Sequence, residues 1–340
     1  MTGGLHAAAR AALDAYGRAN APFVEISTSH NTVCRVDAPG GPFALRIAPH
    51  GTVHRPGAAD AERALLDDLA SRGVRAPRVV PTDDGAASVT VEVPDLPGAR
   101  ECMLLAWVPG VPVRRPCSVE QATDLGRVAA QLHELAPTAL LLPPGVLDGR
   151  DALAFAVPDL LDTAGRLAPV LRDAHDRAQA AVDDLWESRA GAGAAARVLH
   201  GDLTQTNVLT TEPSPDTAAD TSPGDAPRLV PIDFQDLLWG HVEQDLAISL
   251  LRLSRDDETG ERCAAFRAGY AAVRPWPALD AGLLRDLFAA RRLQMVNLTL
   301  VLGRPGSGPA IDLHTAALER YAAGAGPAGQ EGAAIAAVTS

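Results

Sequence analysis

An aspartate and an asparagine lie close together in the segment V-L-H-G-D-L-T-Q-T-N-V-L, residues 198–209, as Asp202 and Asn207. Apolar residues flank the segment, so we expect a loop between two strands that can aim both side chains at one point. A second carboxylate, Asp233, follows the hydrophobic run at 230–232. Phosphoryl transfer needs a carboxylate that orients a hydroxyl group and accepts its proton, and oxygen ligands for Mg²⁺. Asp202 suits the first role, and Asn207 and Asp233 suit the second.

The apolar pattern around these residues indicates the scaffold that must hold them. We predict an α+β fold with a small antiparallel-sheet lobe over residues 1–106 and a larger, mostly helical lobe over 107–321. Residues 211–227 and 322–340 lack periodicity, so we expect a disordered loop and a flexible tail. The first lobe is predicted to contain helices at 5–17 and 58–72 and strands at 31–36, 42–47, 88–93 and 102–107. The second is predicted to contain helices at 119–135 and 163–189, further helices up to 321, and short strands at 197–199, 207–210 and 229–232.

Composition and charge argue against several classes of protein. The net charge of −12 disfavours nucleic acid and anionic membranes as partners, because phosphate groups bind clustered positive charge. The sequence has no long uncharged apolar stretch and no signal-peptide layout, so we expect a cytoplasmic protein. The four cysteines form no C-x-x-C pair, which indicates neither a zinc site nor disulfides. All 30 basic residues are arginine, so arginine must fill any role that usually falls to lysine.

The motif H-G-D-x-x-x-x-N at 200–207, followed by I-D-F at 232–234, resembles the aminoglycoside phosphotransferase and choline-kinase-like families, relatives of the protein kinases. The resemblance extends over nearly the whole chain, because the order of strands and helices also fits. It implies a protein-kinase-like fold, ATP or GTP as co-substrate, Mg²⁺ as cofactor, and a hydroxyl group of a small molecule as acceptor. A P-loop enzyme is excluded, because G-x-x-x-x-G-K-[ST] is absent.

The resemblance also implies a strand cation that grips the nucleotide phosphates and pairs with a helix glutamate. Arg46 and Glu62 fit these positions. An arginine is bulkier than the usual lysine, but it can contact a carboxylate through two parallel hydrogen bonds. The alternative is a solvated arginine on a strand.

Two further segments match nucleotide-binding parts of the family. The stretch S-T-S-H-N-T at 27–32 would cover the phosphates with hydroxyl and backbone N–H groups, with Ser29 and Asn31 as candidates, although it lacks the usual glycines. Leu105 and Trp107 belong to the expected hinge, whose backbone could bond the adenine edge, and Met103 or Trp107 could shape the pocket. Core packing is an equally good interpretation of each of these side chains.

Three other residues suit supporting roles. Asp245 matches a family position that holds the catalytic loop through backbone N–H groups. His133 lies on an apolar helix face, where a hydrogen-bonded core histidine is favoured over a catalytic one. His200 is expected to brace its loop by hydrogen bonds, and Gly201 permits a tight backbone there.

Two sets of charged residues favour opposite acceptors. Glu243 and the acidic run at 256–258 would suit a polyamine-like substrate. Arg291 and Arg292, with Asn297, could meet a carboxylate or phosphate on the substrate, although we favour a solvated helix face for them.

Three functions are compatible with these residues. The first is a small-molecule kinase that acts on an antibiotic or other natural product, as in self-resistance, or on a metabolite such as an amino alcohol or a homoserine-like compound. The second is a protein serine/threonine kinase of the bacterial stress-response type, disfavoured because no A-P-E motif or activation loop follows Asp233. The third is a non-catalytic nucleotide binder, disfavoured because Asp202, Asn207 and Asp233 are all present. We favour the first, with the antibiotic as leading acceptor.

Overall fold

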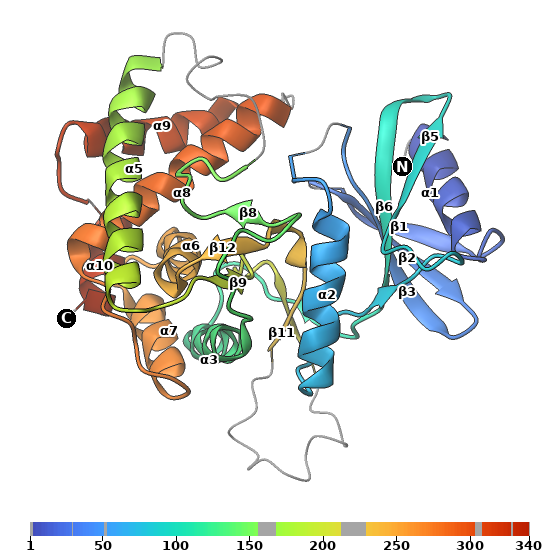
Figure 1. The fold of residues 1–340 in the computed structure, drawn as a ribbon, viewed down its shortest axis with the longest axis horizontal. Helices are drawn as coiled ribbons and strands as arrows, with labels where there is room; N and C mark the ends of the chain where they lie inside the picture. Colours follow the sequence, from blue (N-terminus) through green and yellow to red (C-terminus); the bar gives the residue numbers. More distant parts are fainter. Residues whose placement is uncertain are drawn as a thin grey trace. The chain divides into compact units, whose positions relative to one another are not determined.

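The structure is a computed structural model, described for residues 3–28, 30–50, 53–155, 168–211, 229–302, 308–327 and 329–339. The chain divides into two compact units, Met1–Pro109 and Gly110–Ser340, whose elements are shown in Figure 1. The first unit is built mainly of strands and the second mainly of helices, in agreement with the predicted α+β fold.

The first unit is organised around one antiparallel sheet. Its strands follow the order β1-β2-β3-β6-β4, and β5 also pairs with β6. The strands are β1 (Phe23–Thr28), β2 (Thr32–Ala38), β3 (Gly41–Ile47), β4 (Val79–Val80), β5 (Val89–Val93) and β6 (Leu96–Ala106). The strands predicted at 31–36 and 42–47 are β2 and β3, which form a hairpin whose turn uses Gly40 and Gly41 at positive φ angles of 95° and 124°. The two-residue β4 was missed, as was β1, which contains the first two residues of the predicted phosphate loop.

Two helices complete the first unit. Helix α1 (Gly3–Ala15) lies against β5 and β6 (Figure 1). Beyond its end, the buried Tyr16 hydroxyl donates to the carbonyl of Cys102 at 3.1 Å and accepts from the N–H of Leu104 at 3.2 Å, which ties the helix to β6. Helix α2 (Ala58–Ser71) buries Leu65, Leu66 and Leu69, as its helical spacing predicts.

The second unit consists of seven described helices and two small sheets. Helices α5, α8 and α9 lie side by side in Figure 1, and α3 packs on α7. The helices are α3 (Val119–Leu135), α5 (Ala168–Gly191), α6 (Val242–Ser254), α7 (Glu261–Ala271), α8 (Ala281–Leu302), α9 (Gly308–Ala322) and α10 (Gly329–Thr339). One sheet has the order β11-β10-β7 and the other β8-β12-β9. Their strands are β7 (Val111–Pro112), β8 (Leu147–Asp148), β9 (Arg197–Leu199), β10 (Val208–Thr210), β11 (Leu229–Pro231) and β12 (Leu238–Gly240).

Two glycines allow α3 and α7 to approach closely. A Cβ atom on Gly126 would lie 2.0 Å from the carbonyl oxygen of Phe266, and one on Gly269 would lie 1.9 Å from that of Thr123. Only glycine fits at such separations. This contact matters for the site, because α3 carries His133 and α7 carries the residue that it contacts, Tyr270.

The C-terminal segment differs from the predicted flexible tail. Helix α10 occupies Gly329–Thr339 and buries Ala334, Ile335 and Val338. It contacts α6, α7 and α8. The small apolar residues of this segment show no clear helical period in the sequence. Their burial against the other helices stabilises α10, because most helical stability in proteins comes from packing and not from local propensity. Most of the predicted loop at 211–227 lies outside the described residues.

Candidate active site

The loop between β9 and β10 brings Asp202 and Asn207 together. The Asn207 Nδ2 group donates to the carbonyl oxygen of Asp202 at 2.9 Å and to its Oδ2 at 2.7 Å. This orientation turns the Nδ2 atom of the amide toward Asp202 and leaves Oδ1 as its possible metal ligand. The loop therefore joins the two side chains that the motif singled out.

Strand pairing brings Asp233 to the same end of the sheet. β10 and β11 are antiparallel with Val208 opposite Pro231, and the Ile232 N–H donates to the Asn207 carbonyl at 2.9 Å. Asp233 follows directly, in a left-handed conformation with φ of 64° and ψ of 66°. An aspartate in this sparsely populated region is a conformational outlier, and such outliers cluster at functional sites.

These oxygens fit the ligand chemistry of Mg²⁺. The ion is usually held by one or two protein side chains together with substrate phosphates and water. The Asn207 amide oxygen and the Asp233 carboxylate are hard oxygen donors; Asn207 directly precedes β10, and Asp233 follows the end of the adjacent strand β11. Within the part of the chain that the structure describes, no group of three or more His, Cys, Asp and Glu side chains has the arrangement of a metal site.

His200 and Gly201 shape the loop that carries Asp202. The N–H of Asp202 donates to His200 Nδ1 at 3.3 Å, so His200 Nε2 carries the proton that it donates to the Ile232 carbonyl at 3.2 Å. The histidine thus braces the loop against the segment that bears Asp233, as predicted. Gly201 has a φ of 76°, and a Cβ atom there would lie 1.8 Å from the Asp236 carbonyl oxygen. No other residue fits at this position.

A buried carboxylate supports the same loop from α6. Asp245 is 1% exposed, and its Oδ1 accepts from the Gly201 N–H at 2.9 Å. Its Oδ2 contacts His133 Nε2 at 2.9 Å, and His133 Nδ1 contacts the Tyr270 hydroxyl at 3.0 Å. Burial alone would raise the pKa of Asp245, but the hydrogen bond from His133, the electrostatic interactions with His133 and His200, and the hydrogen bond from the Gly201 N–H outweigh burial and lower it. The predicted supporting roles of Asp245 and His133 are confirmed.

An arginine that the sequence did not assign to the catalytic loop contacts Asp202. Arg291 Nη2 of α8 lies 2.5 Å from Asp202 Oδ1, so both carboxylate oxygens are bound. Burial raises the pKa of Asp202, and Arg291 and Asn207 oppose this shift without cancelling it.

The favoured solvated face for Arg291, Arg292 and Asn297 is wrong. The three residues are 8%, 6% and 1% exposed. The sequence did not lead us to expect buried arginines, because arginine is usually exposed. The apolar residues on either side of them in the helix were the feature that could have indicated burial.

The predicted ion pair of the first unit is present. Arg46 on β3 contacts Glu62 on α2 through two parallel bonds, Nη1 to Oε1 at 3.0 Å and Nη2 to Oε2 at 2.5 Å. Arg46 is 12% exposed at its side chain and Glu62 is 2% exposed, so Arg46 is not a solvated strand arginine.

The other nucleotide-binding candidates have different surroundings. Ser29 lies outside the described residues, and Asn31 is buried between β1 and β2. Met103 is buried, and its sulfur lies 3.5 Å from Arg46 Nη2; Leu105 is also buried, within the sheet. Trp107 is half-buried and stacks under Arg35.

The expected hinge donors already have acceptors. The N–H of Ala106 donates to Arg78 at 2.8 Å, and that of Trp107 donates to Pro42 at 3.1 Å. These two N–H groups are therefore not free to bond the edge of a base.

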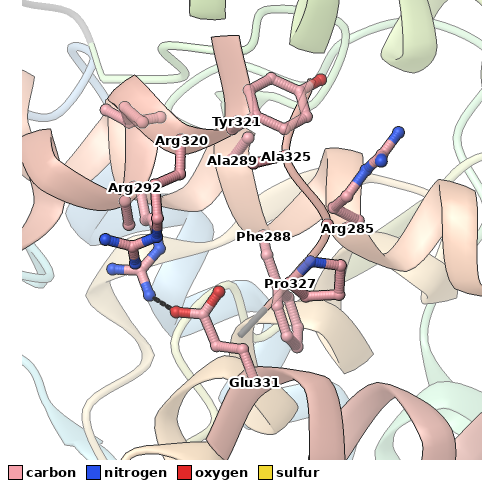
Figure 2. Close-up of a pocket in the computed structure, with 12 residues that line it drawn as sticks. Arg285, Phe288, Ala289, Arg292, Arg320, Tyr321, Ala325, Pro327 and Glu331 are labelled. Carbon is pink, nitrogen blue, oxygen red and sulfur yellow. Dashed lines mark hydrogen bonds and ion pairs between the residues drawn. The ribbon is translucent and has the colours of Figure 1, made fainter. Parts of the chain in front are cut away.

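An open pocket lies beside α8, α9 and α10 (Figure 2). Phe288 and Tyr321 contribute apolar surface, and Arg292 and Arg320 contribute charge. Arg292 forms an ion pair with Glu331 there. None of the three motif side chains lines this pocket, so it is separate from the predicted phosphoryl-transfer site.

Comparisons with known proteins give one family profile and several similar solved structures. The profile of the phosphotransferase enzyme family matches residues 23–281. This range includes the Arg46–Glu62 pair and the three motif residues Asp202, Asn207 and Asp233. No curated protein sequence matches the chain. Among solved structures, a microcompartment-associated aminopropanol kinase is 22% identical with a TM-score of 0.66, covering 96% of this chain and 98% of that one. An amicoumacin kinase is 14% identical with a TM-score of 0.63, covering 88% of each chain. An ethanolamine kinase from Plasmodium vivax is 12% identical with a TM-score of 0.53, covering 94% of this chain and 88% of that one.

These similarities in structure confirm the predicted protein-kinase-like fold. None of the described helices is long and apolar enough to cross a membrane. Because the family profile covers well over half of the chain, including the whole H-G-D-x-x-x-x-N and I-D-F segments, the chain belongs to the phosphotransferase enzyme family, as its sequence predicted.

Proposed function

We propose that the protein transfers the γ-phosphoryl group of ATP to a hydroxyl group of a small molecule. The observation that carries this proposal is the joint placement of Asp202, Asn207 and Asp233 at the ends of β9, β10 and β11. These are the oxygen groups that orient an acceptor hydroxyl and hold a metal on phosphates. The buried support from His200 and Asp245 makes the loop rigid, and rigid positioning is the main protein contribution to phosphoryl transfer.

Each residue takes one role in this proposal. Asp202 accepts a hydrogen bond from the acceptor hydroxyl and then its proton, while the oxygen attacks the γ-phosphorus and ADP leaves. Asn207 Oδ1 and Asp233 bind Mg²⁺, which neutralises charge on the phosphates when bound. Arg46, held by Glu62, binds the α- and β-phosphates. We place the enzyme in the cytoplasm, which agrees with four free, buried cysteines.

The acceptor is proposed from the same chemistry. The structures that resemble this chain include kinases of an amino alcohol and of natural products, so both classes are candidates, with the antibiotic as the leading one. The fold by itself does not choose between them.

The test is release of ADP or GDP from Mg-ATP or Mg-GTP by the purified chain, with antibiotics, amino alcohols and hydroxy acids as acceptors. Acceptor-dependent release that Asp202→Asn abolishes, while nucleotide binding is kept, supports the proposal. Asp233→Asn is expected to weaken Mg-nucleotide binding as well. Full activity in either variant would contradict the assigned roles.

A further inference from the structure

Four arginines gather beside Asp202 in the second unit. They are Arg252 and Arg255, at the end of α6, and Arg291 and Arg292 on α8, and we call them the arginine cluster. The four side chains interact electrostatically with one imidazole, that of His314 on α9. Arg252 also interacts electrostatically with Asp202 itself. If the hydroxyl group of an acceptor binds Asp202, the other groups of that acceptor molecule would therefore lie next to the arginine cluster.

The cluster has more hydrogen-bond donors than acceptors. His314 faces Arg255 Nη2 through Nε2 at 3.2 Å and Arg292 Nη1 through Nδ1 at 3.3 Å. A neutral imidazole accepts at only one of its nitrogens, so one of these contacts places two N–H groups against each other. Burial and the surrounding arginines lower the pKa of His314 to about 3, so the ring is neutral at pH 7.

Two arginines of the cluster lack complete partners. No hydrogen bond or ion pair joins Arg252 to any residue that the structure describes. Arg255 Nε is buried, and no described residue accepts from it. The same holds for the hydroxyl of Thr315, next to His314, which is 5% exposed. Burial, followed by repulsion from Arg115 and Arg255, lowers the pKa of Arg252 to about 10.

Three of the four acidic residues that would have favoured a cationic acceptor form other contacts, and the fourth, Glu258, is exposed. Glu243 is buried in an ion pair with Arg189. Asp256 is paired with Arg115 at 2.8 Å, and Asp257 is fully buried and accepts from the Cys263 N–H at 2.9 Å.

Charge around the cluster is therefore positive. Together with Arg115 and Arg320 it has six guanidinium groups, against the four carboxylates of Asp202, Asp236, Asp256 and Glu331. Like charges held together in a partly buried place destabilise the folded protein, so a bound anion would relieve them. Strongly perturbed groups next to a catalytic candidate are typical of binding sites.

Resting on the proposed function, we propose that the acceptor is a small hydroxylated anion, and that Arg252 and Arg255 bind its carboxylate or phosphate group beside Asp202. Arginine suits this role because its planar fork matches both groups. A polycationic acceptor such as an aminoglycoside would meet repulsion from the same residues.

The test begins with thermal unfolding of the full chain in millimolar sodium sulfate or sodium glycerate, against sodium chloride at equal ionic strength. The wild type is compared with Arg252→Gln and with Arg172→Gln, an exposed arginine of α5. We expect both anions to raise the Tm of the wild type and of the control. Arg252→Gln should weaken the apparent affinity roughly tenfold to hundredfold, the loss typical of one charge-assisted hydrogen bond.

A second readout separates binding from folding. Because no described residue forms a hydrogen bond or ion pair with Arg252, and repulsion from neighbouring arginines exceeds its attraction to Asp202 and Asp256, Arg252→Gln should fold normally, and its Tm without anion should equal or exceed that of the wild type. Equal stabilisation of all three proteins would mean only the general effect of salt on stability and would overturn the inference. Loss of the anion effect when Mg-AMP-PNP is present would also overturn it, because the cluster would then belong to the nucleotide.

Turnover distinguishes this inference from the proposed function. ADP release is compared for matched acceptors with and without a carboxylate, namely glycerate against glycerol and homoserine against 3-amino-1-propanol. Faster turnover of the carboxylates supports the inference. Turnover restricted to acceptors without a carboxylate would overturn it and leave phosphoryl transfer intact. Specific anion binding with no ADP release from any acceptor would support the anion site and count against the proposed function.

Discussion

Replacement of Asp245 by asparagine tests whether this buried carboxylate holds the loop that carries Asp202. Asp245 receives hydrogen bonds from His133 and from the Gly201 backbone, both at 2.9 Å, and it is 1% exposed. Asparagine has nearly the same shape but one acceptor and one donor. Its oxygen can accept from Gly201 while its Nδ2 donates to His133 Nε2, provided that His133 moves its proton to Nδ1 and donates to Tyr270.

The expected loss of stability follows from the change of these two hydrogen bonds from a charged to a neutral acceptor or donor. A hydrogen bond to a charged group contributes about 1.5–3 kcal/mol and a neutral one about 0.5–1.5 kcal/mol. Two bonds that change from charged to neutral should therefore lower the free energy of unfolding by about 2–3 kcal/mol. Asp245→Ala leaves both donors without an acceptor and should cost more, about 3–5 kcal/mol.

Urea unfolding monitored by tryptophan fluorescence measures these values. Three of the four tryptophans, Trp186, Trp239 and Trp276, belong to the second unit, so the signal reports mainly on the unit that contains Asp245. The midpoint should fall with an unchanged m-value. Equal losses in the free energy of unfolding for Asp245→Asn and Asp245→Ala would refute the expected move of the His133 proton to Nδ1. A loss below about 0.5 kcal/mol in either variant would refute the role of Asp245 in holding the loop.

The pH dependence gives an independent check. The folded pKa of Asp245 lies below its ordinary value of about 3.9. The carboxylate therefore stabilises the folded state fully above about pH 4, and this contribution disappears as the pH falls through the folded pKa. The stability difference between wild type and Asp245→Asn should be constant from about pH 5 to 7 and shrink below about pH 4. A difference that grows on acidification would contradict the sign of the shift.

Three further predictions concern other parts of the site. Gly201→Ala should lower the free energy of unfolding by at least about 2 kcal/mol in urea titrations, because its Cβ would meet the Asp236 carbonyl; a neutral effect would contradict the loop geometry. Arg46→Lys should keep the KM for ATP within a few fold, whereas Arg46→Gln, which leaves Glu62 unpaired, should raise it about tenfold or more; an unchanged KM in both would remove Arg46 from nucleotide binding. Because the pKa of Asp202 is raised, the acid limb of the kcat/KM profile should lie above about pH 4, and a limb below it would exclude Asp202 as the base.

The spacing of residues within one short segment was enough to single out Asp202 and Asn207 as candidate site residues. Asp202 and Asn207 lie on one short loop, so chain connectivity already keeps them together, and the structure joins them by hydrogen bonds. Alternating and helical apolar patterns likewise predicted β2, β3, α2 and α3, because each buries one face that repeats along the sequence.

Short or weakly patterned elements could not be predicted in this way. β4, β7, β8 and β12 have two or three residues each, too few for a period, and they exist because neighbouring strands pair with them. Helix α10 likewise depends on packing against α6, α7 and α8.

The sequence by itself determined the family and the fold class and singled out the H-G-D-x-x-x-x-N and I-D-F segments, because these follow from spacing within short segments. Tertiary structure decided which distant groups share one environment. Arg291 meets Asp202 from a helix 89 positions away, and Arg252, Arg255 and Arg292 surround His314 only after α6, α8 and α9 have packed. The charge of a residue in the sequence does not reveal its burial, since arginine is ordinarily exposed, and burial is what strengthens the electrostatic interactions of these side chains.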